Sequence, residues 1–198
     1  NFVANESDPA IKERLKRYTS HISREIIRMT ELMDDVLILG KVSAGKMTVL
    51  KTEQDINQLI TDIALQFKEI QTDGRYLEVE SFGMPKKIQL DIKMLRHALT
   101  NIIANAFKYS TSRNPIITIN YQSNWIKISI QDFGIGIPSD EIENLFQPFH
   151  RAKNAADVPG SGLGLSIAKD YLELNGGTIN VESKINEGSC FNISIPVA

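Results

Sequence analysis

The stretch LTNIIANAFKYS, residues 99–110, places polar side chains inside an otherwise apolar helical pattern. Asn101 and Asn105 are four residues apart and therefore lie on one face of the predicted helix. A buried amide without a partner costs about 1–3 kcal/mol, so the two asparagines either face solvent or meet a ligand. An asparagine oxygen suits Mg²⁺, which takes most of its ligands from phosphate and water. Lys108 can reach a phosphate as a point charge, and Tyr109 offers a flat ring or a hydroxyl to a base.

A second stretch, DFGIGIP, begins at residue 132, where a predicted strand ends. The Asp132 carboxylate can accept a hydrogen bond from an exocyclic amine such as that of adenine. Gly134 and Gly136 follow at once, and glycines let the chain turn tightly beside a ligand. Taken alone, Asp132 could equally cap the turn that these glycines make.

A third stretch, GSGLGLS, lies at the predicted start of a helix and contains Gly160, Gly162 and Gly164. Backbone amides at a helix N-terminus carry partial positive charge and suit phosphate, and glycine lets the anion approach closely. The stretch lacks the Lys-Ser/Thr of a P-loop, and no strand directly precedes it as in a dinucleotide fingerprint. A ligand-free flexible loop is the alternative interpretation.

Four motifs, NIIANAFKYS, DFGIGIP, LFQPFHRA and GSGLGLSIAKDYLELNGGTI, resemble in order and spacing the N, G1, F and G2 boxes of sensor histidine kinases. This resemblance covers residues 55–198, as the ATP-binding domain. RMTELMDDVLILGKVSAGKM resembles the second helix and exit linker of the family's dimerisation and phosphotransfer domain. Four ordered motifs are far more specific than any one of them.

The resemblance implies a Bergerat-type site for ATP and Mg²⁺. Asn105 would bind Mg²⁺ with Asn101 in support, and Asp132 would read the adenine amine. Lys108 would meet the phosphate chain, and Tyr109 would border the nucleotide. The remaining expected contacts are Gly134 and Gly136 at the base, Gly160, Gly162, Leu163 and Gly164 at the phosphates, and Arg151 and Lys153 on a mobile lid anchored by Phe146 and Phe149.

The family's phosphate-accepting histidine lies in a pattern like His-Glu-x-x-Thr-Pro, which this sequence lacks. His21, His97 and His150 lie in other segments. We therefore expect the sequence to be a fragment whose acceptor helix lies outside it. The implied function is transfer of the ATP γ-phosphate to that histidine in two-component signalling. The implied partners are the acceptor-histidine helical domain, a response regulator receiver domain and a second copy of the chain.

One long helix is predicted over residues 9–40, with Asp8 as N-cap and Pro9 at its first position. Apolar residues recur in it at steps of three and four, which is typical of a coiled-coil or bundle seam. Such a stripe needs a partner helix, so we expect a homodimer through residues 9–40. We predict a helix and linker over 1–48 and the ATP-binding catalytic domain over 49–198.

Helices and alternating strands follow one another in the rest of the chain. They predict an α/β fold, a two-layer α/β sandwich with a mixed sheet, preceded by the helix of a helical bundle. Further helices are expected at 55–70, 91–109, 139–146 (capped by Ser139) and 164–175, and strands at 76–81, 86–90, 115–121, 125–132, 178–183 and 190–197.

The composition excludes several classes of protein. The 22 basic and 24 acidic residues give a net charge of −2, without the basic excess of a nucleic-acid binder. Cys190 is the only cysteine, which excludes an intrachain disulfide framework and suits a reducing compartment. We expect a cytoplasmic location and leave membrane anchorage of the full-length protein open. Two rival functions remain, an ATPase clamp of the chaperone, mismatch-repair or topoisomerase type and a non-catalytic dimerisation and signalling module.

Overall fold

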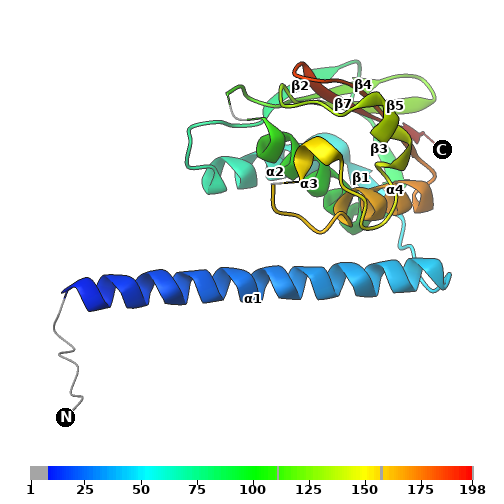
Figure 1. Ribbon diagram of the computed structural model, residues 1–198. Coiled ribbons are helices and arrows are strands. Elements are labelled where there is room, and N and C mark those ends of the chain that lie inside the picture. Colours follow the sequence, from blue (N-terminus) through cyan, green and yellow to red (C-terminus); the bar gives the residue numbers. More distant parts are fainter. Residues whose placement is uncertain (1–8, 111, 157, 198) are drawn as a thin grey trace, which may run out of the picture.

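The computed structural model describes residues 9–110, 112–156 and 158–197. A long helix precedes a unit in which helices and strands alternate, as Figure 1 shows. The helices are α1 (Pro9–Ser43), α2 (Ile56–Ile70), α3 (Ile92–Tyr109) and α4 (Gly164–Leu174), with short 3₁₀ helices η1 (Ser139–Asn144) and η2 (Lys153–Ala155). The strands are β1 (Thr52–Asp55), β2 (Glu78–Phe82), β3 (Lys87–Leu90), β4 (Ile116–Tyr121), β5 (Trp125–Gln131), β6 (Thr178–Lys184) and β7 (Gly188–Pro196).

The main sheet has five strands in the order β2-β4-β5-β7-β6. β2 and β4 are parallel and the other pairs are antiparallel, so the predicted mixed sheet is confirmed. In Figure 1, α2, α3 and α4 lie on one side of this sheet, which gives the predicted two layers. β1 and β3 form a separate antiparallel pair, and β1 is a strand that the sequence did not predict.

The core lies between the sheet and the helices. In β5, Ile126, Ile128 and Ile130 are fully buried and alternate with exposed or half-buried polar residues, because successive side chains of a strand point to opposite faces. The buried side of α3 faces them with residues such as Leu99 and Ile103. This burial leaves one edge of α3 outside the core, and that edge carries the asparagines.

Aspartates start two of the helices. Asp55 Oδ1 accepts from the backbone N–H of Asn57 at 2.9 Å, and Asp91 Oδ1 accepts from that of Lys93 at 3.1 Å. These bonds satisfy amides that a helix start leaves without partners. The predicted Ser139 cap is wrong, because Pro138 is the cap residue, no side chain bonds to the helix start, and the segment is 3₁₀ rather than α.

The first helix, α1, runs a little further than predicted, to Ser43. Its proposed Asp8 cap lies outside the described residues. Leu32, Ile38 and Val42 are half-buried at the domain end, whereas apolar residues along the rest of the helix, such as Ile22 and Met33, are exposed. Within the described ranges, no helix combines the length and the apolar character needed to cross a bilayer.

Candidate functional site

Helix α3 turns its polar edge toward α4. Asn101 and Asn105 are both half-buried, and Asn101 Nδ2 donates to the carbonyl oxygen of Gly164, the first residue of α4, at 3.2 Å. Asn101 therefore joins the two helices while Asn105 faces open space one turn further on. Both asparagines line the same pocket, as their spacing on one helix face predicts.

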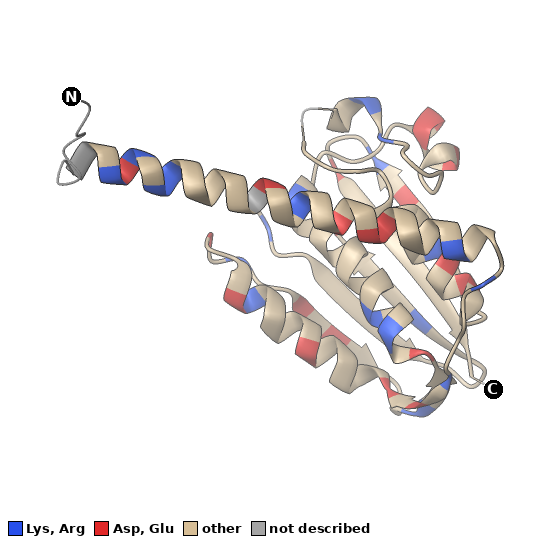
Figure 2. Ribbon diagram, turned by 90° about the horizontal axis from the view of Figure 1, so that it is seen from below, with Lys and Arg blue, Asp and Glu red and all other residues tan. Residues whose placement is uncertain are grey.

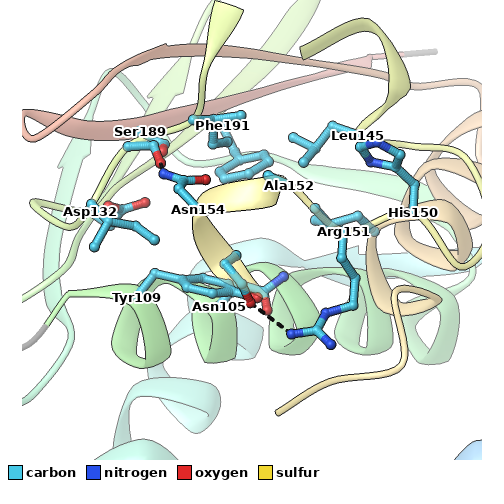
Figure 3. Close-up of a pocket in the computed structure, with 15 residues that line it drawn as sticks. Asn105, Tyr109, Asp132, Leu145, His150, Arg151, Ala152, Asn154, Ser189 and Phe191 are labelled. Atoms are coloured by element: carbon cyan, nitrogen blue, oxygen red, sulfur yellow. Dashed lines mark hydrogen bonds between the residues drawn. The ribbon is translucent and has the colours of Figure 1, made fainter. Parts of the chain in front are cut away.

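Two adjoining pockets lie along this edge of α3, and Asn105, Tyr109 and Arg151 line both of them. The first, which we call the inner pocket, lies toward the sheet and encloses ≈ 80 Å³ (Figure 3). Its other lining residues are Asp132, Ile135, Gly136, Ile137, Leu145, His150, Ala152, Asn154, Ala155, Leu165, Ser189 and Phe191.

The second pocket, which we call the outer pocket, opens toward α1 and has a volume of ≈ 460 Å³. It brings together the α3 residues, the glycine-rich segment before α4 and the middle of α1. Its lining residues besides the shared three are Arg28, Glu31, Leu32, Asp35, Asn101, Ala104, Lys108, Pro159, Gly160, Ser161, Gly162 and Gly164.

Asp132 is the acidic group of the inner pocket. It is only 5% exposed, and its Oδ1 accepts from the backbone N–H of Gly134 at 2.8 Å. Burial raises the pKa of this carboxyl, against smaller lowering effects of hydrogen bonds from Gly134 and Ser189. The carboxylate thus combines a desolvated position with a fixed orientation, which suits recognition of one amine on an apolar ring.

The glycines beside Asp132 are required by close backbone contacts. A side chain at Gly134 would collide with the carbonyl oxygen of Tyr109. Gly136 has a φ of +66°, and a side chain there would collide with the backbone of Lys184. Gly134 thus allows the chain after β5 to approach the end of α3, and Gly136, which lines the pocket, allows it to approach β6.

Lys108 faces the glycine-rich segment across the outer pocket. A Cβ built on Gly160 would lie 2.7 Å from Lys108 Nζ, which shows how closely the ammonium approaches the backbone. Burial lowers the pKa of Lys108, and the nearby charges of Arg151 and Arg28 lower it further. Three cations, Lys108, Arg151 and Arg28, thus share this pocket with two acidic residues of α1, Glu31 and Asp35, which leaves an excess of positive charge beside the glycine-rich segment.

The segment before α4 presents backbone rather than side chains. Gly162 has a φ of +74° and accepts at its carbonyl from the N–H of Phe149 at 3.0 Å. Gly164 begins α4, whose N-terminal amides lie at the outer pocket. Leu163, in contrast, is fully buried in the core and lines neither pocket, unlike the glycines on either side of it.

Between Gly136 and Gly160 the chain forms a segment that we call the lid. Arg151 of the lid lines both pockets, whereas Lys153 lines neither of them. Lys153 is 81% exposed at its side chain and pairs with Glu141 at 3.2 Å. The prediction that Phe149 anchors the lid in the core is wrong, since it is 64% exposed, whereas Phe146 packs half-buried against the core.

Several lining residues were missed by sequence reasoning. His150, Asn154 and Ser189 reach the inner pocket, and the spacing of the motifs gave no signal for them. Glu31 and Asp35 reach the outer pocket from α1, which passes over the domain in Figure 2. Burial raises the pKa of Asp35, while the proximity of His97 lowers it. No local pattern predicts that this part of α1 lies beside the pocket.

The polar groups of the outer pocket can complete the coordination of a magnesium ion but cannot supply all of it. Among the described residues, no group of three or more His, Cys, Asp or Glu side chains is placed to hold a metal. Asn105 instead offers a neutral oxygen beside a pocket rich in cations. A Mg²⁺ ion that takes its remaining ligands from phosphate and water needs no more from the protein.

Comparison with known families and proteins gives concordant matches. Residues 90–198 match the family described as histidine kinase-, DNA gyrase B-, and HSP90-like ATPase. The chain is 32% identical over 196 residues to the signal transduction histidine-protein kinase ArlS of Staphylococcus epidermidis. That match covers 97% of this chain and 42% of ArlS, so the chain spans about two fifths of that relative's length.

Solved structures share the fold. A mycobacterial sensor histidine kinase, MprB, superposes with a TM-score of 0.62 at 26% identity, covering 75% of this chain and 98% of that one. Full-length ShkA, solved in complex with AMPPNP, superposes with a TM-score of 0.78 at 23% identity, covering 92% of this chain and 39% of that one. The likeness to ShkA extends over α1 as well as the α/β unit, and it concerns the fold alone.

Proposed function

This chain belongs to the histidine kinase-, DNA gyrase B-, and HSP90-like ATPase family, and we propose that it is the ATP-binding catalytic region of a sensor histidine kinase. In this proposal residues 1–48 form the dimerisation helix and linker, and residues 49–198 form the catalytic domain. The proposed reaction moves the γ-phosphoryl group of ATP to a histidine on a helical domain. The phosphorus–oxygen bond to ADP breaks as a phosphorus–nitrogen bond forms.

The observation that carries the proposal is that the two pockets share Asn105, Tyr109 and Arg151. A nucleotide with its base in the inner pocket would extend its phosphates into the outer pocket along α3. Asp132 would accept from the adenine amine, and Tyr109 would border the base. Gly134 and Gly136 would shape the wall of the base site.

At the phosphate end, the proposed contacts are cationic side chains and backbone amides. Lys108 and Arg151 would meet the phosphates, and Lys153 would reach them only after movement of the lid, because it now pairs with Glu141. Asn105 would hold Mg²⁺ with Asn101 in support, and the ion would neutralise phosphate charge. The backbone that would cradle the phosphates belongs to Gly160, Gly162, Leu163 and Gly164.

Catalysis in this proposal consists mainly of positioning and charge neutralisation. Phosphoryl transfer demands alignment of the attacking nitrogen with the leaving oxygen, and stabilisation of the charge on the transferred group. Lys108, Arg151 and the Mg²⁺ ion held by Asn105 would stabilise this charge. The acceptor-histidine domain would supply the attacking nitrogen. The proposed partners are that domain, a response regulator receiver domain and a second copy of the chain bound through residues 9–40, in the cytoplasm.

Phosphotransfer to a separately produced acceptor-histidine domain of the full-length protein tests the proposal. With Mg·ATP, we expect an acid-labile phosphohistidine on the acceptor. Asn105→Ala should lower Mg·ATP affinity, measured by calorimetry, by about tenfold or more, since contacts with charged groups contribute about 1.5–3 kcal/mol.

The outcomes separate the rival functions. Steady ATP hydrolysis with no labelled histidine would instead favour an ATPase clamp. Absence of any Mg·ATP binding would favour a non-catalytic signalling module. Unchanged affinity in Asn105→Ala would contradict the proposed metal site. Lys127→Ala, an exposed substitution in β5 on the outer face of the sheet, is the matched control and should bind as the unaltered chain does.

A further inference from the structure

Helix α1 forms one wall of the outer pocket. Steps of three and four residues place four of its side chains on one helix face, and these line the pocket, namely Arg28, Glu31, Leu32 and Asp35. The facing wall is the polar edge of α3 together with the glycine-rich segment before α4. Figure 2 shows α1 lying across this side of the α/β unit. Charged groups of α1 are therefore part of the pocket, although none of them belongs to the four motifs that predicted it.

The charges on this face of α1 follow an order along α3. Burial lowers the pKa of His97, in the first half of α3, and the carboxylate of Asp35 acts against that effect. At the last turn of α3, burial and Arg151 lower the pKa of Lys108, and the charge of Arg28 lowers it further. Helix α1 thus passes α3 in the opposite direction, with Asp35 toward the start of α3 and Arg28 toward its end. The cationic end of the face lies where the phosphates are proposed to bind.

The guanidinium of Arg28 is only weakly held by other groups. Its ion pair with Glu25, one turn earlier in α1, is 3.8 Å long, and about half of each side chain is exposed. Pairs this exposed contribute little to stability, because water screens both charges. An anion in the pocket would therefore compete with Glu25 for Arg28 at little cost.

Lys108 and Arg28 face the same space with the same charge. The charges that act on half-buried Lys108 are those of Arg151 and Arg28, and both are positive. Like charges repel, and an anion placed between them replaces this repulsion with attraction. Phosphate suits the position of Arg28, because a guanidinium donates two parallel hydrogen bonds to its oxygens.

We propose that Arg28 is a phosphate-binding residue, so that α1 and the α/β unit hold the polyphosphate of a nucleotide between them. The contact rests on the proposed function only in taking the polyphosphate to be that of a nucleotide. Arg28 binds it from the side of the pocket that faces the glycine-rich segment. The phosphate site is complete only where α1 lies over it, since one of its cations comes from that helix.

Calorimetry of the whole chain with Mg·ATP and with adenosine tests the contact. Arg28→Gln should lower the affinity for Mg·ATP by about three- to tenfold, because an exposed guanidinium is screened by water and contributes less than a buried one. The affinity for adenosine should stay unchanged, since Arg28 lines the outer pocket and not the inner one. A general loss of structure would weaken both ligands, so the difference between them identifies a phosphate contact.

Two further variants separate this contact from a change in net charge. Arg14→Gln removes the same charge from an exposed position nearer the N-terminal end of α1, outside both pockets, and should bind Mg·ATP as the unaltered chain does. Arg28→Lys keeps the charge but loses the planar donor set, so it should recover part of the lost affinity. A role of Arg28 in packing alone would not give this partial recovery.

Binding of magnesium tripolyphosphate tests the contact without a nucleotide, and Arg28→Gln should weaken it as it weakens Mg·ATP. The contact is overturned if Arg28→Gln binds both probes as tightly as the unaltered chain. It is also overturned if Arg14→Gln loses as much affinity as Arg28→Gln, or if Arg28→Lys is no stronger than Arg28→Gln.

The contact and the proposed function fail in different ways. Undiminished Mg·ATP affinity and phosphotransfer in Arg28→Gln would refute the contact and leave the proposed function intact. A chain that binds tripolyphosphate through Arg28 but binds no nucleotide would refute the proposed function and leave the contact supported. A chain that binds neither probe would refute both.

Discussion

At the scale of single residues, Asp132 is a site residue that lowers the stability of the folded chain. Its carboxyl is buried beside apolar residues such as Phe191, and its hydrogen bonds come from the backbone of Gly134 and from the backbone and hydroxyl of Ser189 rather than from a cation. Desolvation disfavours the charged form of such a group. The folded chain therefore holds a carboxylate at a free-energy cost that a bound amine would offset.

We predict that Asp132→Asn stabilises the free chain at neutral pH and weakens its binding of Mg·ATP. Because the pKa of Asp132 is raised on folding, the native state binds more protons than the unfolded state just above pH 3.8. The stability that Asp132 contributes is thus present below that pH and is lost as pH rises through the folded pKa. Urea unfolding at pH 4 and pH 7 should show that the variant's advantage grows with pH.

The matching control is Asp62→Asn, which alters a half-exposed carboxylate paired with Arg96 on the helix surface. The same pH series should show no growing advantage for that variant. An Asp132→Asn chain whose stability relative to the unaltered chain is the same at both pH values would contradict the desolvation argument. Undiminished Mg·ATP affinity, measured by calorimetry, would contradict the role proposed for the carboxylate.

At the scale of elements, the C-terminal end of α3 is fixed from outside the helix. Arg75, in the loop between α2 and β2, donates to the carbonyl oxygen of Phe107 at 3.1 Å and to that of Ser110. The guanidinium lies over the Phe107 ring, 5.4 Å from its centroid, and is paired with Asp73 at 2.7 Å. These contacts satisfy carbonyls that a helix end leaves without partners, on the turn that carries Lys108 and Tyr109.

We predict that Arg75→Gln lowers the free energy of unfolding by about 1.5–3 kcal/mol, the range for hydrogen bonds to charged groups. Mg·ATP affinity should fall as well, since the last turn of α3 loses its fixed position. Urea unfolding and calorimetry measure the two effects. Lys93→Gln, an exposed change at the other end of the same helix, should stay within about 0.5 kcal/mol of the unaltered chain. Equal stabilities of the two variants would exclude the capping role.

The base of the lid has its own polar contacts. Glu141, buried in η1, pairs with His150 Nε2 at 2.9 Å and with Lys153 Nζ at 3.2 Å. These contacts connect η1, the segment before Arg151 and η2. They explain why Lys153 lies away from the pockets, since its ammonium is held beside η1.

At the scale of the whole molecule, two stretches of α1 have different surroundings. In the stretch near the α/β domain, Val42 packs against the domain core, and the outer pocket is lined by Leu32 and Asp35. Further toward the N-terminus, the apolar stripe is exposed, with Ile22 at 57% and Ile26 at 59%. A stripe of this length on one helix is unfavourable in water without a partner.

We predict that the chain dimerises through this stripe and that Ile22→Glu shifts it to a monomer. A charge placed in an apolar helix seam must be desolvated without a partner, which disfavours association strongly. Sedimentation equilibrium measures the change. Ser20→Glu adds the same charge on the opposite side of α1 and should leave the dimer intact. A chain that remains monomeric at high concentration would contradict the seam.

Most of the helices and strands could be predicted from the amino-acid sequence alone, and so could the shared helix face of Asn101 and Asn105. Periodicity places the helices and most strands, because 3.6- and 2-residue repeats follow directly from backbone geometry. The spacing of Asn101 and Asn105 predicts a shared face for the same reason. Glycines such as Gly136 mark places where the backbone has no room for a side chain.

Which distant segments meet became known only from the folded chain. The short strand β1 pairs with β3, and Phe149 is exposed on a backbone of positive φ whose N–H donates to the carbonyl oxygen of Gly162. The bonds of Arg151 to the carbonyls of Ala155 and Ala156 lie in a stretch of irregular backbone, and the approach of α1 to the outer pocket joins segments far apart in the chain. Such contacts depend on the packing of the whole chain, and no local pattern of side chains encodes them.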